Sequence, residues 1–256
     1  MILGIESFRQ WFADYAGQYV IIGGTACDLL FSEDGLAFRA TKDIDMVLII
    51  ENLTPAFGTR FWEYISIAEY EHINKSTGEP QFYRFANPKS KDFPFMIELF
   101  SRRNDAITLP ENAALTPLPL DEELSSLSAI LMDDDYYQLL LDGTMLIDGI
   151  PLLDAGRLIP FKAKAWLDLS ARREAGENVD SRNIKKHKND VFRLSILLTP
   201  ETRIIIPDSI HADLSDFLSA MKTESVDLEQ FGIRNQDQKE ILDKIAAAYI
   251  KKTSVS

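Results

Sequence analysis

The chain has 256 residues, which is enough for one large domain or two modest ones. Asp and Glu number 40 against 27 Lys and Arg, so the formal net charge is −13. This acidity argues against indiscriminate nucleic-acid binding, which depends on basic residues that neutralise phosphates, although a local basic patch stays compatible with it. It also suits a basic protein partner.

Cys27 is the single cysteine, so no intramolecular disulfide can form and a reducing, cytoplasmic compartment is favoured. The N-terminal sequence MILGIESFRQWFADY has neither the basic region nor the long apolar region of a signal peptide. No uninterrupted apolar stretch approaches the roughly 20 residues that a membrane-spanning helix requires. We therefore expect a cytoplasmic monomer without a membrane partner.

The first half of the chain alternates between helical and strand patterns. Apolar residues at helical spacing predict helices over Ile5–Tyr15, Thr25–Phe31 and Thr54–Glu69. Apolar, β-branched and aromatic runs predict strands over Tyr19–Ile22, Met46–Ile50, Gln81–Asn87 and Phe93–Phe100. Polar or proline-containing stretches predict irregular connections over Ser32–Thr41 and Ser101–Leu120.

The second half changes to a helical pattern. Before the change, Asp142-Gly143 reads as a hairpin turn between strands at Tyr136–Leu141 and Met145–Ile147. The predicted helices that follow are Arg157–Glu174, Ser181–Leu198, Ser209–Lys222 and Gln236–Lys252. We therefore predict an α/β (α+β) fold, with a mixed twisted sheet flanked by helices in residues 1–155 and a helical C-terminal domain in 156–256.

Two acidic residues open the strand that follows the first predicted loop, in the sequence Asp43-Ile44-Asp45. Side chains alternate along a strand, so both carboxylates project to the same side. Adjacent carboxylates repel each other unless a cation lies between them. Mg²⁺ prefers oxygen ligands and often takes one or two carboxylates together with substrate phosphates. These residues therefore predict a Mg²⁺ site that a nucleoside triphosphate would complete.

Gly23-Gly24-Thr25 marks a turn from a strand into a helix. Glycine lets the backbone approach a phosphate closely, and the N–H groups that open a helix can donate to phosphate oxygens. The Thr25 hydroxyl could add another donor. This segment is the predicted phosphate-binding turn, although a Gly-Gly pair alone is typical of an ordinary turn.

Glu98 is the ionisable residue of the apolar stretch FPFMIELF. Because burial of a lone charge is costly, a metal or a cationic partner is expected beside it. Glu98 is therefore the candidate third metal ligand, in a two-metal arrangement with Asp43 and Asp45. Two structural alternatives stay open: Glu98 could face solvent on an edge strand, or it could pair with Arg102.

The ordered set GGTACDLL…TKDIDMVL resembles the nucleotidyltransferase superfamily related to DNA polymerase beta. Its signature is Gly-Gly or Gly-Ser, a spacer, and then Asp-x-Asp or Asp-x-Glu on a strand. The TKDID form followed by a helical half is similar to the AbiEii-type nucleotidyltransferases, the toxins of type IV toxin–antitoxin and abortive-infection systems. The resemblance implies a nucleotidyltransferase fold. Gly24 and Asp43 are 19 positions apart, longer than in many members, and we expect Arg39 and Lys42 of this spacer beside the metal site.

The resemblance also implies a lysine on a helix after the sheet, which contacts nucleotide phosphates, and a supporting aspartate on the next helix. Lys162 fits the lysine position best, with Lys164 second, and Asp190 fits the aspartate position. Two residues that are two apart on a helix cannot both face one point, so at most one of these lysines faces the site. Asp190 could instead pair locally with Lys186 or Arg193.

We therefore expect a Mg²⁺-dependent nucleotidyltransferase. The resemblance implies an RNA acceptor, such as the 3′ end of tRNA, and a toxin role restrained by a protein or DNA-binding antitoxin. The basic run Arg182–Lys188 suits either an RNA-facing surface or a solvated helix face. Two alternatives stay open. The acceptor could be a small molecule such as an aminoglycoside, or a protein, or the chain could be a non-catalytic nucleotide-binding module.

Overall fold

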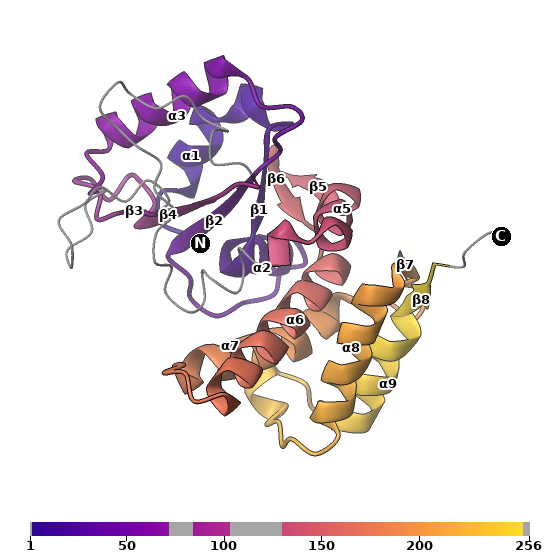
Figure 1. The fold of residues 1–256 in the computed structure, drawn as a ribbon. Coiled ribbons are helices and arrows are strands. Elements are labelled where there is room, and N and C mark those ends of the chain that lie inside the picture. The colour runs from indigo at the N-terminus through magenta and orange to yellow at the C-terminus, as the bar shows by residue number, and fades with distance from the viewer. Residues whose placement is uncertain (1, 72–83, 103–129, 253–256) are drawn as a thin grey trace. The chain divides into compact units, whose positions relative to one another are not determined.

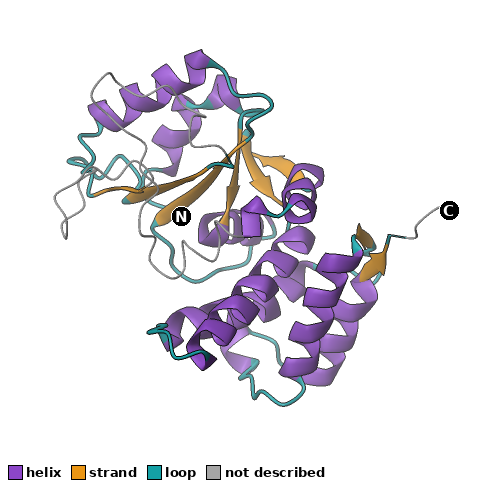
Figure 2. Cartoon of the chain, viewed as in Figure 1, coloured by secondary structure: helices purple, strands orange, loops and turns teal. Residues whose placement is uncertain are grey.

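The computed structural model describes residues 2–71, 84–102 and 130–252, drawn in Figures 1 and 2. The chain forms two compact units. The first unit comprises Met1–Pro119 and Thr144–Asp154, and the second comprises Leu120–Gly143 and Ala155–Ser256. The chain thus contributes one segment to the second unit, returns to the first, and then completes the second.

The first unit is built on a six-stranded mixed sheet. Its strands are β1 (Tyr19–Ile22), β2 (Asp43–Leu48), β3 (Arg84–Ala86), β4 (Met96–Phe100), β5 (Thr144–Ile147) and β6 (Ile150–Leu153). Their spatial order is β3-β4-β2-β1-β6-β5. β1 is antiparallel to β2 and parallel to β6, whereas β2 is parallel to β4. The prediction of an α/β architecture with a mixed sheet is confirmed.

Helices cover both faces of this sheet. They are α1 (Ile5–Trp11), α2 (Gly23–Glu33) and α3 (Pro55–Ile67), and a 3-10 turn at Ala13–Tyr15 follows α1 in the chain. Figure 1 shows α1 and α3 together on one face. Aromatic rings fill that face, because Tyr19 of β1 lies 5.8 Å from Phe8 of α1 and 6.2 Å from Phe57 of α3 between ring centroids.

The strand register assigns a line of side chains to the face opposite these aromatic rings. Ile22 of β1 lies opposite Asp45 of β2, Asp45 lies opposite Glu98 of β4, and Glu98 lies opposite Arg84 of β3. Directly opposed residues of neighbouring strands point to the same face. Tyr19 is three residues before Ile22 in β1, so its aromatic ring points to the other face.

The second unit is mainly helical, as predicted. Its elements are α5 (Asp134–Asp142), α6 (Ala155–Glu174), α7 (Ser181–Leu194), α8 (Asp208–Met221) and α9 (Gln238–Ala248), with a two-stranded parallel sheet of β7 (Ile204–Ile206) and β8 (Tyr249–Lys251) and 3-10 turns at Ser195–Leu197 and Glu229–Phe231. α6 packs against both α7 and α8. Among the residues described, no helix has the length and apolar character needed to cross a membrane.

The predicted hairpin around Asp142-Gly143 is wrong. Tyr136–Leu141 lies within helix α5, which begins after Asp133, whose carboxylate accepts hydrogen bonds from two backbone N–H groups of the first turn. This N-cap satisfies donors that a helix start leaves unpaired, and it favours a helix over a strand. The observed hairpin joins β5 and β6 through Asp148-Gly149, both with positive φ, as such tight turns require.

The last predicted helix, Gln236–Lys252, is also wrong at its C-terminal end. α9 stops at Ala248, and the next three residues pair in parallel with β7. The hydrogen bonds of this ladder come from a strand more than 40 residues earlier in the chain, which local periodicity cannot reveal. Most of the predicted connection Ser101–Leu120, and the start of the predicted strand Gln81–Asn87, lie outside the described residues.

Candidate active site

The three predicted acidic residues lie on one face of the central strands. Asp43 and Asp45 are alternate residues of β2 and share this face. β4 places Glu98 directly opposite Asp45. Because paired strands are about 4.8 Å apart, the carboxylates of Asp45 and Glu98 face each other at close range.

Glu98 is buried and pairs with Arg84 of β3. Arg84 Nε donates to Glu98 Oε1 at 2.7 Å, and Arg84 Nη2 lies 2.6 Å from the same oxygen. The pKa of Glu98 is raised to about 9, chiefly by burial and also by the charge of Asp45, while Arg84 acts to lower it. The raised pKa favours the protonated form of Glu98, which is in hydrogen-bonding contact with Asp45.

Gly23 brings the glycine turn into contact with this carboxylate face. Its φ of +70° is in the left-handed region, and a Cβ atom built on it would lie 1.6 Å from Asp45 Oδ2. A side chain at position 23 would therefore overlap the Asp45 carboxylate. Glycine is required here both by backbone conformation and by the close approach of the two segments.

Gly24 faces the spacer that precedes β2. A Cβ atom built on it would lie 2.7 Å from Thr41 Oγ1 and 3.3 Å from Arg39 Nη2. The spacer thus folds back over the start of α2 and brings the Arg39 guanidinium to the glycine turn. The expectation that Arg39 would lie near the site agrees with this placement.

Thr25 links the start of α2 to β2. Its side chain is fully buried, and Oγ1 donates to the backbone carbonyl of Asp43 at 2.6 Å. The one hydroxyl proton of Thr25 is used by this bond, so a hydrogen bond to a phosphate would require it to break. In this structure Thr25 holds the first aspartate of β2 against the glycine turn.

The donor set fits Mg²⁺ in part. Two half-buried carboxylates on one face, with a glycine backbone against one of them, match the one or two carboxylates that Mg²⁺ usually takes from protein. A third ligand is not in place, because in the described part of the chain no group of three or more His, Cys, Asp or Glu side chains is arranged to hold a metal. Asp43 and Asp45 would hold the ion, and Glu98 orients Asp45.

Lys42 lies apart from these carboxylates. Its side chain is exposed, and Nζ lies 5.7 Å from the centroid of the Phe95 ring. Phe95 is itself exposed, at the bend just before β4. Among the described residues, Lys42 forms no ion pair with Asp43 or Asp45.

Lys162 and Asp190 pair with each other inside the second unit. Lys162 Nζ on α6 lies 3.5 Å from Asp190 Oδ2 on α7, and both side chains are buried. Arg193 Nη1 lies 3.6 Å from the other oxygen of Asp190. The structure thus forms the local pair with Arg193 that the sequence suggested, together with a pair with Lys162.

Lys164 points to different neighbours, as expected for residues two apart on a helix. Its Nζ lies 3.0 Å from Asp213 Oδ1 on α8 and 3.5 Å from Asp168 Oδ1 on α6. These two carboxylates raise the pKa of Lys164 against the opposing effect of its partial burial. Lys164 is therefore an ion-pairing residue between α6 and α8.

The basic run Arg182–Lys188 does not form one uniform positive face. Arg182 pairs with Asp180 at the start of α7, His187 is buried, and Lys188 pairs with Glu224 at 2.6 Å. Lys185 is exposed. The cations of this run are thus divided among several local environments.

Arg84 was not among the residues predicted for the site. Its place in the alternating sequence QFYRFAN indicates a strand, but that pattern does not identify the partner of its guanidinium. The partner follows from the register of β3 against β4.

Comparison of the chain with protein-family models, with curated proteins and with solved structures found no match. Functional inference from this site therefore depends on its own geometry and chemistry.

Proposed function

We propose that the protein is a Mg²⁺-dependent nucleotidyltransferase with a nucleotidyltransferase fold, which transfers a nucleotidyl group from a nucleoside triphosphate to an acceptor hydroxyl and releases pyrophosphate. One observation carries the proposal: the Gly23 backbone lies against the Asp45 carboxylate, closer than any side chain would permit. A phosphate-binding turn and a metal-binding carboxylate in contact are what a metal-bound triphosphate requires.

The site residues of the first unit have separate roles in this proposal. The N–H groups at the start of α2 donate to phosphate oxygens, and Arg39 beside Gly24 adds positive charge. Asp43 and Asp45 hold Mg²⁺, which when bound neutralises phosphate charge during in-line displacement. Glu98 would keep Asp45 in position. A bound cation would favour the deprotonated form of Glu98, which would then be a candidate acceptor for the proton of the attacking hydroxyl.

Lys162 and Asp190 enter the proposal through the resemblance. The resemblance implies that Lys162 contacts the triphosphate and that Asp190 supports it, and within the second unit these two residues pair with each other at 3.5 Å. Lys164 is the weaker candidate, because its ammonium already has two carboxylate partners. The toxin role and the antitoxin stay predictions.

RNA is the acceptor that the resemblance implies, but the charge of the chain favours a second candidate. A protein with a net charge of −13 attracts cations and repels polyanions at long range. A small cationic acceptor with hydroxyl groups, such as an aminoglycoside, is compatible with that field. A single transfer assay, described next, distinguishes the two acceptor classes.

Labelled nucleoside triphosphates are incubated with the protein and Mg²⁺, in the presence of either total RNA or a panel of small hydroxyl-bearing cations. Asp45→Asn keeps the shape of the side chain but removes its charge, so we expect label transfer to fall below detection while the circular dichroism spectrum is unchanged. Asp34→Asn, at an exposed position after α2, is the matched control and should retain full transfer.

Calorimetric titration with Mg²⁺ and each triphosphate distinguishes an enzyme from a non-catalytic nucleotide-binding module. Mg²⁺-dependent binding without transfer to any acceptor would favour a non-catalytic nucleotide-binding module. Full transfer activity in Asp45→Asn, or no binding of any triphosphate, would contradict the proposed function.

A further inference from the structure

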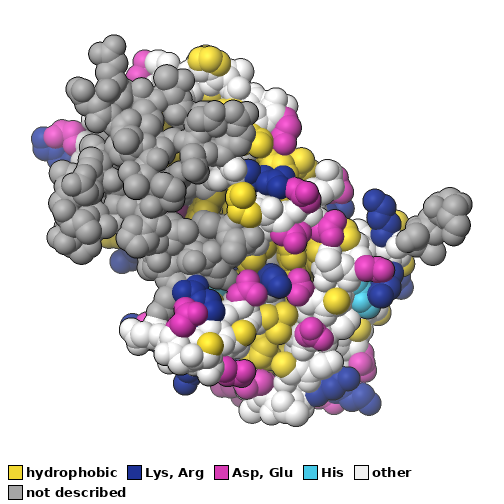
Figure 3. All heavy atoms as spheres, viewed as in Figure 1, with side chains coloured by type: hydrophobic (Ala, Val, Ile, Leu, Met, Phe, Trp, Pro, Cys, Tyr) yellow, Lys and Arg dark blue, Asp and Glu magenta, His cyan; other side chains and the backbone are white. Residues whose placement is uncertain are grey.

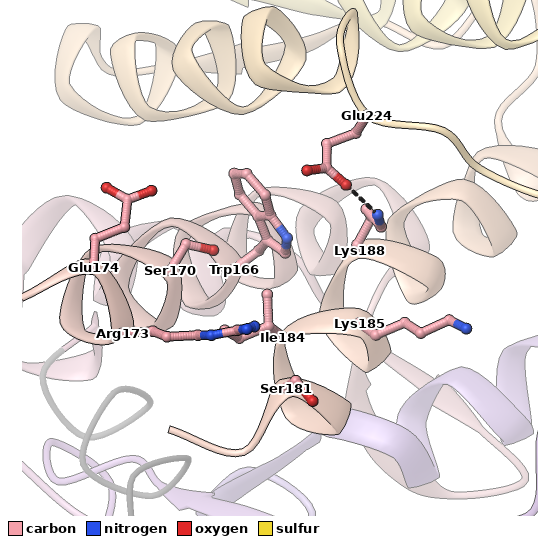
Figure 4. Close-up of a pocket in the computed structure, with 9 residues that line it drawn as sticks. All are labelled: Trp166, Ser170, Arg173, Glu174, Ser181, Ile184, Lys185, Lys188 and Glu224. Carbon is pink, nitrogen blue, oxygen red and sulfur yellow. Dashed lines mark hydrogen bonds and ion pairs between the residues drawn. The ribbon is translucent and has the colours of Figure 1, made fainter. Parts of the chain in front are cut away.

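A pocket with a volume of about 480 Å³ lies within the second unit (Figure 4). It is formed by the C-terminal half of α6, the first turns of α7 and the segment that follows α8. Sites for small molecules commonly have volumes of about 300–1,000 Å³. None of the residues proposed for nucleotidyl transfer lines this pocket, so it raises a separate question of function.

The base of the pocket is apolar. Trp166 is 9% exposed and is held from behind by Phe217 of α8, with ring centroids 5.4 Å apart in an edge arrangement. The half-buried Ile184 of α7 lies beside it. The indole Nε1–H of Trp166 donates to no other described residue, and it is not among the buried unsatisfied groups. The base therefore offers apolar surface and one available donor.

The rim of the pocket is polar and carries a net positive charge. Three basic residues, Arg173, Lys185 and Lys188, line it together with two acidic ones, Glu174 and Glu224. Lys188 is occupied by Glu224 at 2.6 Å, drawn as a dashed line in Figure 4. Arg173 and Lys185 form no ion pair with any described residue.

Arg173 is the best placed of these free cations. Figure 4 shows its guanidinium group extending below Trp166 toward Ile184, across the pocket. A guanidinium presents planar, paired donors that match the oxygens of a phosphate or carboxylate. The pocket thus offers such donors beside an apolar base, on a chain whose net charge of −13 would repel long polyanions.

We propose that this pocket binds a nucleotide unit, with its phosphate on Arg173 and its flat ring against Trp166 and Ile184. The volume matches a single nucleotide, and the lining carries one net positive charge to oppose a phosphate. The unit could be a free mononucleotide or one residue of a single-stranded RNA, since both present the same chemistry. The proposal depends on the second unit alone and not on nucleotidyl transfer.

Calorimetric titration of the 256-residue protein in EDTA, with AMP, adenosine, inorganic phosphate and a short oligoribonucleotide, tests this proposal. We expect AMP to bind more tightly than adenosine or phosphate alone, because it engages both parts of the pocket. Arg173→Gln should weaken AMP binding about tenfold, the size expected for loss of a charged hydrogen-bonding partner. Arg234→Gln, at an exposed position of the same unit, is the matched control and should have no effect.

A gain of affinity provides a second test that a purely structural role would not produce. Glu224→Gln removes the partner of Lys188 and one acidic charge from the lining, so AMP should bind several-fold more tightly. Oligoribonucleotide binding that exceeds AMP binding, with the same dependence on Arg173, would identify RNA as the source, and the reverse order would identify a free nucleotide.

Two results would overturn the proposal. The first is an absence of AMP binding at millimolar concentration. The second is AMP binding that Arg173→Gln and Arg234→Gln leave equally unchanged.

Discussion

At the scale of single residues, the candidate site depends on how closely Gly23 approaches Asp45. The left-handed backbone of Gly23 turns the chain directly from β1 into α2, and the missing Cβ leaves room for the Asp45 carboxylate. The same close approach places the helix start beside the acidic face. A change at either residue should therefore affect both stability and ligand binding.

Gly23→Ala should destabilise the protein by about 1–3 kcal/mol, because alanine is strained at this φ and its Cβ overlaps Asp45. Urea unfolding measures the loss, and Mg²⁺–triphosphate titration should show weakened binding. Gly17→Ala is the matched control, since a Cβ there meets nothing within 4 Å and should change stability by less than about 1 kcal/mol. Equal effects of the two substitutions would refute the steric argument.

Glu98 predicts a pH dependence of stability with a defined sign. Burial holds its pKa near 9 in the folded protein, above the ordinary value of 4.5. The folded state therefore binds more protons than the unfolded state between these values, and the free energy of unfolding should fall as pH rises from 4.5 through about 9.

Glu98→Gln should flatten this dependence, because glutamine does not titrate and still provides a polar group to Asp45. Urea unfolding in EDTA at several pH values would show it, with a reduction of the pH effect on the order of several kcal/mol. Glu33→Gln, at an exposed position of α2, should leave the slope as in the natural protein. An unchanged slope in Glu98→Gln would mean that another group causes the dependence.

At the scale of elements, the buried pair of Lys162 and Asp190 joins α6 to α7. A buried pair is costly to break from one side, because the remaining buried charge loses part of its compensation. Such a pair can also keep a lysine charged and oriented for a ligand. Stability and activity measurements on the same variants distinguish the structural role from the functional one.

Lys162→Met should destabilise the protein by about 3 kcal/mol, and addition of Asp190→Leu should recover part of that loss by removing a buried carboxylate that has lost its lysine partner. Chemical unfolding of the single and double variants measures this coupling. Lys239→Met, exposed on α9, is the control and should change stability by less than about 0.5 kcal/mol. If the double variant recovers stability but not nucleotide transfer, Lys162 acts on the ligand as well as on Asp190.

At the scale of the whole molecule, the second unit is assembled from two separate segments. α5 precedes the β5–β6 hairpin in sequence, yet it packs against α6 and α8. The Tyr136 ring lies 5.2 Å from that of Phe161, and its hydroxyl bonds to Asp213 at 3.1 Å. The predicted domain boundary at residue 155 separates α5 from these partners and can be tested with fragments.

The fragment Ala155–Ser256 should be less stable than a fragment that also carries Ile130–Gly143 through a flexible linker. Burial of each large apolar side chain of α5 contributes about 1.5–3 kcal/mol, so the difference should amount to several kcal/mol. Thermal unfolding followed by circular dichroism compares the two fragments. Equal stability would support a division of the chain at residue 155.

Much of the secondary structure of this protein is determined by local sequence patterns alone. Periodicity located most helices and strands, and alternation placed Asp43 and Asp45 on one face of β2. The prediction from periodicity was wrong at Tyr136–Leu141, where a short apolar run fits a strand or a helix equally. The Asp133 N-cap favours the helix there. The prediction was also wrong at Tyr249–Lys251, where pairing with β7 stopped the helix.

The tertiary structure alone decided which distant groups meet. The partner of Glu98 depends on strand register, because β3 and β4 are aligned by backbone hydrogen bonds that no residue type specifies. The contact between Gly23 and Asp45 depends on the antiparallel pairing of β1 with β2. The pocket beside Trp166 depends on how α6, α7 and the segment after α8 pack. Sequence periodicity specifies which face a side chain occupies, and the fold specifies what lies opposite it.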